Sequence, residues 1–157
     1  MTLGPALVRL EQWAPVRALA TSDWGYPLVS TLHLLGIALL LGSIVTVDLR
    51  LLGLWRHSLS LPAVMQLRRV AGVGLLLAVV TGAALFSVRA SEYIENPWLL
   101  RKWVLLVAAV FNAAALGARQ WLIGAAALEG RHAQVAGAMS LVLWLGALAC
   151  GRWIAFA

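Results

Sequence analysis

The sequence predicts an all-α integral membrane protein, a four-helix bundle preceded by an N-terminal amphipathic helix in the membrane interface. Of its 157 residues, 62% are hydrophobic and 11% are charged, and the mean hydropathy is +0.90, unlike a soluble domain of this size. Four apolar runs recur, each about long enough to cross a bilayer. The predicted spans are about residues 27–47, 70–88, 101–120 and 133–152. They leave no room for a soluble domain, so 1–157 is one membrane domain.

The segment 1–25 predicts the interfacial helix. Its apolar side chains recur near the helical period, at Leu7, Leu10, Trp13 and Val16. Charged and polar residues interrupt this pattern too often for a span, while tryptophan and tyrosine suit the headgroup level. Pro15 is expected to bend or end the helix.

The first span contains one ionisable side chain, His33, and an ionisable group inside a membrane marks a candidate functional site. Asp48 and Arg50 are interpreted as the boundary of this span. Ser58 to Pro62 are interpreted as a connection that ends with a proline stop.

The basic residues predict the orientation. The first connection is rich in arginine, with Arg50, Arg56, Arg68 and Arg69, whereas Arg17 alone lies close to the other flank of the first span. Basic loops stay in the cytoplasm, and the first span usually decides the orientation, so the N-terminus is predicted outside. The net charge of +6 is attributed to these membrane flanks, so no nucleic-acid partner is expected.

The remaining spans show packing signals. Glycines in the second span would let helix backbones approach closely, and Asn112 in the third is interpreted as an interhelical hydrogen-bonding residue. The fourth span ends in an anchor formed by Arg152 and Trp153. The single cysteine, Cys150, excludes an intramolecular disulfide.

Helix alternation predicts a ligand site at the outer leaflet. His33, Gly36, Arg101, Lys102 and Arg152 would gather on one side, as an apolar pocket beneath a cationic rim. Such a pocket suits haem b or another tetrapyrrole, with His33 as the iron ligand if haem is bound, and Gly36 could admit the flat ring. The alternative is that His33 bonds a backbone carbonyl or a Ser/Thr hydroxyl across the bundle, and that Gly36 serves close packing.

Three functions remain open on these residues. The first is a redox protein that binds a tetrapyrrole or quinone. The second is a non-catalytic accessory subunit that packs against lipid, other membrane proteins or a second copy of itself. The third is a small transporter, ranked last because no carboxylate is expected inside the membrane. No catalytic constellation is recognised, so enzyme activity stays open.

The region from Trp24 to Phe156 resembles a family of uncharacterised bacterial four-span membrane proteins. The resemblance rests on the strings WGYPLVSTLHLLGIALLLGSIVTVDLRLLG, NPWLLRKWVLLVAAVFNA and MSLVLWLGALACGRWIAF. It implies the bacterial inner membrane. More distantly, the chain is similar to HemJ-type protoporphyrinogen oxidases and CopD-like membrane proteins, where His33 would match a haem-associated histidine and Lys102 a lysine. Gly117 stands where members of the closer family often carry a histidine, so a second ligand is missing.

Overall fold

The computed structural model describes residues 4–154 and 156, and these residues are almost entirely helical. Seven α-helices and one 3-10 helix follow one another along the described chain. Their bounds are α1 Gly4–Glu11, α2 Ala14–Thr21, α3 Gly25–Leu51, α4 Leu61–Val88, α5 Ala90–Ile94, α6 Pro97–Ile123, η1 Gly124–Leu128 and α7 Gly130–Trp153.

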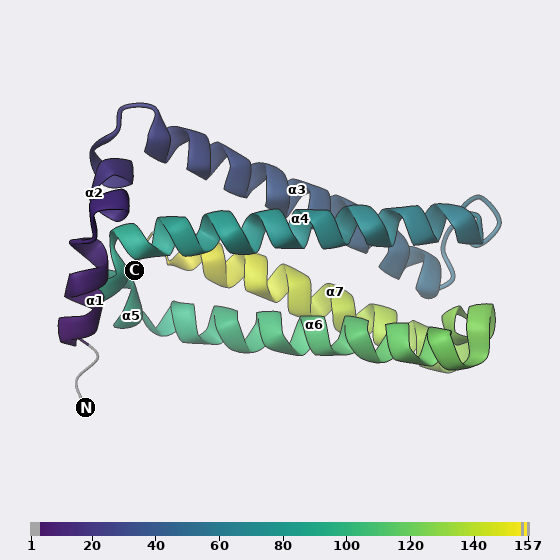
Figure 1. Ribbon diagram of the computed structural model, residues 1–157. Coiled ribbons are helices and arrows are strands. Elements are labelled where there is room, and N and C mark those ends of the chain that lie inside the picture. Colours follow the sequence, from purple (N-terminus) through teal and green to yellow (C-terminus); the bar gives the residue numbers. More distant parts are fainter. Residues whose placement is uncertain (1–3, 155, 157) are drawn as a thin grey trace.

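The four long helices, α3, α4, α6 and α7, run side by side, and the short helices α1, α2 and α5 lie at one end of them (Figure 1). The last residues of α7 also lie at this end, which we call the terminal end. The opposite end, formed by the connection 52–60 and η1, is called the loop end. The predicted all-α fold, with four antiparallel spans and a helical N-terminal segment, is therefore confirmed.

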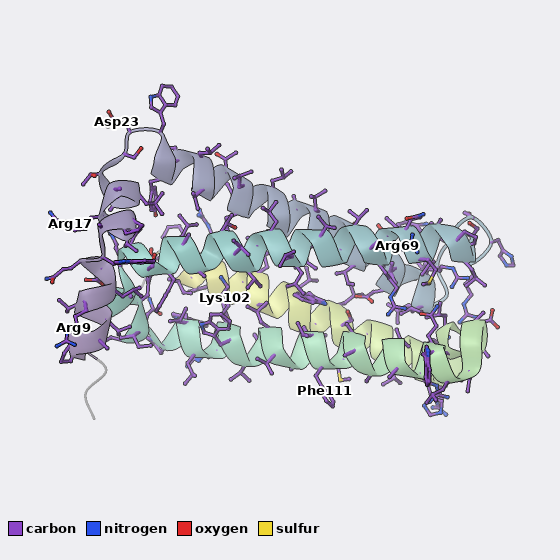
Figure 2. The ribbon with its side chains drawn as sticks, in the orientation of Figure 1. Arg9, Arg17, Asp23, Arg69, Lys102 and Phe111 are labelled. Atoms are coloured by element: carbon purple, nitrogen blue, oxygen red, sulfur yellow. The ribbon has the colours of Figure 1, made fainter. Side chains whose placement is uncertain are left out.

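Each of the four long helices is long and apolar enough to cross a membrane. Their outward surface is also apolar. On α6, an exposed stripe recurs at helical spacing through Leu100, Val104, Val107 and Phe111, and Figure 2 shows Phe111 pointing away from the bundle. Such a surface is costly in water and suits lipid, which indicates a multi-pass membrane protein.

The helices form two hairpins, α3 with α4 and α6 with α7, and α3 also packs against α7. The first hairpin is held at a glycine crossing. A Cβ added at Gly36 would lie 2.7 Å from Ala78 N, and one added at Gly74 would lie 2.6 Å from Leu40 N. Backbone packs directly on backbone here, which is how helices associate where lipid supplies no hydrophobic drive.

Two buried clusters fill the bundle. The central cluster takes one residue from each long helix: Leu40, Ala71, Ala109 and Trp144. The cluster nearer the loop end joins α3, α4, η1 and α7: Val47, Leu51, Val64, Leu128 and Ala133. Each hairpin therefore contributes to both clusters.

The span boundaries differ from the prediction at the first connection. α4 begins at Leu61, well before residue 70, because the Ser60 side chain accepts a hydrogen bond from Ala63 N at 3.4 Å and Pro62 occupies the first turn. Proline is tolerated there because its missing N–H would be unpaired in any case. The interpretation of Pro62 as a stop was therefore wrong, since this proline begins a helix.

The N-terminal segment forms two helices. The segment is interrupted, as expected, since α1 ends at Glu11; Pro15, however, does not end that helix but lies in the first turn of α2. The part of the predicted helix that covers residues 1–3 lies outside the described residues.

Candidate functional site

His33 lies on α3, in the half of the helix nearer the terminal end, and is partly buried against α4. Its Nδ1 is 3.1 Å from Thr81 Oγ1. The Thr81 hydroxyl donates its only hydrogen to the Leu77 carbonyl, 2.5 Å away, so it can only accept from the imidazole. This arrangement fits the neutral tautomer that carries its hydrogen on Nδ1 and leaves the Nε2 lone pair available.

The same imidazole rests on a glycine of α4. A Cβ added at Gly82 would lie 2.9 Å from His33 Cε1 and 3.4 Å from Nδ1. The ring thus occupies the space that a side chain at position 82 would need. Thr81 and Gly82 together fix the position of His33. The contact with Thr81 is the hydrogen bond to a hydroxyl across the bundle that was the stated alternative for this histidine, whereas the contact with Gly82 was not predicted.

Gly36 lies one turn further along α3 and is buried at the crossing with α4. The space beside it is filled by the backbone of Gly74 and Ala78. The first interpretation of Gly36, as an opening for a flat ring, is therefore corrected: the glycine serves close helix packing, which was the stated alternative.

Of the three predicted cationic side chains, that of Lys102 points into the bundle, whereas those of Arg101 and Arg152 point outward. Lys102 lies between α6 and α7 (Figure 2), with its Nζ 3.4 Å from where a Cβ on Gly151 would be. It is close enough to His33 for a Coulombic interaction. Arg101 and Arg152 are exposed, and each guanidinium carbon lies over an aromatic ring, at 4.5 Å from the Trp98 centroid and 4.6 Å from the Phe156 centroid.

These residues fit haem in part. The free Nε2 of His33 is the atom that would bind iron. The opening expected beside Gly36 is closed, however, and the two arginines expected to hold propionates are turned onto aromatic rings. Among the described residues, no group of three or more His, Cys, Asp or Glu side chains could hold a bare metal ion.

A second polar cluster lies nearer the loop end and was missed by the sequence pattern. Asp48 was interpreted as a boundary residue, but it lies within α3 and is only 2% exposed. It lines a cavity of about 20 Å³ with Arg68 of α4, Asn112 of α6 and Ser140 of α7. A carboxylate is therefore buried inside the bundle, near the end of α3.

Two side-chain contacts fix the surroundings of this cluster. Asn112 Nδ2 donates to the Ala136 carbonyl at 3.0 Å, which confirms its predicted role between helices. Arg68 donates to Gln120 Oε1 and so connects α4 to α6. Asp48 stands beside Arg50 at the end of an apolar run, so no pattern within α3 alone indicated that it is buried.

The terminal end is held by a polar contact outside the spans. Glu11 Oε1 accepts hydrogen bonds from Ser91 N at 2.8 Å and from Ser91 Oγ at 2.7 Å, and so connects α1 to α5. These bonds lower the pKa of Glu11 below its ordinary value of 4.5. Burial and the nearby Tyr26 raise the pKa of Tyr93, whose ring stacks on Phe86 at 6.2 Å.

Comparison of the chain with protein-family models, with curated proteins and with solved structures finds no match. The resemblances to the four-span family and to the HemJ-type and CopD-like proteins therefore stay predictions. The class defined by the fold is that of a small helical multi-pass membrane protein with two polar centres, one at His33 and one at Asp48.

Proposed function

We propose that the protein binds the head group of a membrane quinone or quinol at His33, in a redox role at the outer leaflet of the bacterial inner membrane, with its N-terminus outside. The observation that carries this proposal is the chain of hydrogen bonds from His33 Nδ1 to Thr81 and from Thr81 to the Leu77 carbonyl. It leaves Nε2 as a fixed acceptor in a half-buried site.

A quinol has a hydroxyl group that can donate a hydrogen bond to Nε2. A quinone has carbonyl oxygens that can accept hydrogen bonds from an ammonium group. Lys102 supplies that ammonium group within Coulombic range of His33. Beside His33, the side chains of Leu34 and Leu35 are 64% and 48% exposed, which suits contact with an isoprenoid tail. The free imidazole, the cation and the apolar flank together favour an amphipathic quinone.

Haem b is the second candidate, because the same Nε2 lone pair suits iron. In that case His33 would hold the iron, and Arg101, Lys102 and Arg152 would hold the acid groups. Haem would supply one-electron chemistry when bound. The resemblance to HemJ-type proteins favours this candidate, while the filled space at Gly36 favours the quinone.

The test compares ligand binding to purified protein from cells grown with ample haem. Visible spectra of the oxidised and reduced protein report haem. Quenching of the eight tryptophans during titration with a water-soluble ubiquinone analogue reports quinone binding. The variants are His33→Ala, Thr81→Val, which removes the acceptor hydroxyl, and Thr81→Ser, which restores it. The control is His132→Ala, an exposed histidine at the loop end.

We expect saturable quenching by the analogue. Its dissociation constant should rise at least about tenfold, a loss of about 1.4 kcal/mol of binding free energy, in His33→Ala and Thr81→Val but not in Thr81→Ser or His132→Ala. A haem spectrum lost in His33→Ala would favour the second candidate. A colourless protein whose quenching is the same in all four variants would contradict both candidates and favour an accessory role with a protein partner or a second copy.

A further inference from the structure

The Asp48 cluster contains a deeply buried acidic group with an unsatisfied oxygen. Asp48 is 2% exposed, and its Oδ2 has no hydrogen-bond partner among the described residues. A buried carboxylate oxygen without a partner carries a large desolvation cost. Something further must bind this oxygen in the working protein.

The cavity beside Asp48 has the size and lining for one water molecule. Its volume is about 20 Å³, and a water needs about 10–15 Å³ measured in this way. A buried water also needs two to four polar partners. Asp48, Arg68, Asn112 and Ser140 line the cavity and provide them. Asn112 Nδ2 already donates to the Ala136 carbonyl, which leaves Asn112 Oδ1 to accept a hydrogen bond from the water.

The charges around the cavity argue against a metal cation. Arg68 of α4 is the one cationic side chain among the described residues that line it, and it would repel a cation. α6 and α7 present the uncharged Asn112 and Ser140. On α3 itself, Arg50 is directed away, because its Nε donates to the Leu59 carbonyl at 2.8 Å. Asp48 therefore faces one cation, and no direct ion pair joins it to Arg68 in the described chain.

The cluster also lies close to the loop end. The backbone carbonyl of Asp48 accepts a hydrogen bond from Leu52, which caps α3, so the carboxylate is one turn from the end of the helix. Arg68 is partly exposed and reaches from the cavity towards Gln120. A proton therefore has a short polar route between the cavity and the surface at this end.

We propose that this cavity is a proton-binding site in which one water molecule joins the Asp48 carboxylate to the Arg68 guanidinium. The water donates to Asp48 Oδ2 and accepts from Arg68. A proton arriving from the loop end binds Asp48 to give the neutral acid, and it leaves by the same route to restore the carboxylate. The site is separate from His33 and does not depend on the ligand bound there.

The chain offers a direct experiment because it contains two aspartates, Asp23 and Asp48. Protein labelled with ¹³C at the aspartate carboxyl is compared with unlabelled protein by infrared spectroscopy, over a pH series in which the helix content is unchanged. Asp23→Asn removes the exposed aspartate, so that the remaining isotope-shifted bands belong to Asp48 without any change at the site. Asp48→Asn checks the assignment.

In Asp23→Asn protein we expect a carboxylic-acid carbonyl band that disappears as the pH rises, a carboxylate band that replaces it, and a shift of the acid band in D₂O. A band that stays in one form over the whole series, or an acid band that does not shift in D₂O, would overturn the proposal.

The role of the water is tested by filling the cavity. Ala113 lines it, whereas the adjacent Ala114 is exposed, so Ala113→Val and Ala114→Val form a matched pair. We expect Ala113→Val to lose the band of a buried water, identified by its shift in H₂¹⁸O, and to slow the D₂O shift of the Asp48 band at least fivefold. Equal behaviour of the two valine variants would overturn the bridging water.

Discussion

Gly36 shows how the absence of a side chain sets the distance between two spans. A methyl group at this position would lie 2.7 Å from a backbone nitrogen of α4, and backbone cannot rotate away as a side chain can. We predict that Gly36→Ala destabilises the protein by about 1–3 kcal/mol, the usual cost of overpacking. The measurement is the midpoint of SDS-induced unfolding in detergent, followed by circular dichroism.

The control for Gly36→Ala lies on the same helix. Gly42 is exposed, and a Cβ added there meets nothing within 4 Å, so Gly42→Ala should leave stability unchanged or raise it by about 0.5–1 kcal/mol through helix propensity. Equal losses in the two variants would show that the glycine crossing is not the cause.

Asn112 is a second residue whose contribution can be measured alone. Its side chain holds α6 to α7 through the Ala136 carbonyl. We predict that Asn112→Ala lowers the free energy of unfolding by about 1 kcal/mol, since interhelical hydrogen bonds in membranes contribute about 0.6–2 kcal/mol each. The same SDS titration measures it, with Ala114→Leu as the control on α6, because Ala114 is exposed and leucine is nearly as good a helix former as alanine. No loss in Asn112→Ala would contradict this role.

At the scale of single residues, the sequence predicted which side chains are unusual better than where they point. His33 and Asn112 were predicted because a polar residue within an apolar run is conspicuous. Asp48 was not, because it stands at the end of such a run beside charged Arg50, and its burial depends on the packing of other helices against α3. Gly36 could not be assigned between its two interpretations, since its partner, Ala78, belongs to another helix.

Among the elements, the contact between α1 and α5 should respond to pH. Hydrogen bonds from Ser91 lower the pKa of Glu11, so they stabilise the docked helix above the ordinary carboxyl pKa of 4.5. This contribution is lost as the pH falls through the lowered value, because the protonated acid accepts more weakly. We predict faster hydrogen–deuterium exchange in residues 4–11 at that pH, after correction for the intrinsic rate.

Two variants check the cause of this pH response. Glu11→Gln should exchange faster in residues 4–11 at all pH values, because the neutral amide accepts more weakly than the carboxylate. Glu95→Gln, at an exposed glutamate, should behave like the unchanged protein. A pH response that persists in Glu11→Gln would assign the effect to another group.

The helix boundaries were the least predictable feature of the elements. The segment 61–69 contains Gln66, Arg68 and Arg69, and its polarity hides its helical character from a hydropathy pattern. The Ser60 cap and Pro62 in the first turn do mark a helix start. The pattern at Pro62 was interpreted as a stop because a proline after a polar segment can either end the preceding helix or begin the next one.

For the whole molecule, the proposed orientation predicts which end reagents can reach in intact bacterial cells. In a Cys150→Ala background, Asp23→Cys should react with a membrane-impermeant maleimide and Ser58→Cys should react only after lysis, since both positions are exposed at opposite ends of the bundle. The yield of labelled protein is read on a gel. The reverse pattern would place the N-terminus inside.

The overall fold was predictable because four long apolar runs admit few solutions: helices must satisfy their own backbone in lipid, and short connections make neighbours antiparallel. The pairing of the helices was not. It depends on the Gly36–Gly74 crossing and on the contact between α3 and α7, which join residues far apart in the chain. For the same reason, no pattern in one span could indicate the cavity at Asp48, whose lining comes from four helices.

The glycine crossing between α3 and α4 also bears on how the chain is made. These two helices are neighbours in sequence and form the most extensive helix pair of the molecule, so their contacts need no later segment. The first hairpin can close in the bilayer while the ribosome is still synthesising α6 and α7, and the second hairpin then docks on a partner that already exists. Biogenesis would thus proceed hairpin by hairpin, with the contact between α3 and α7 as its last step.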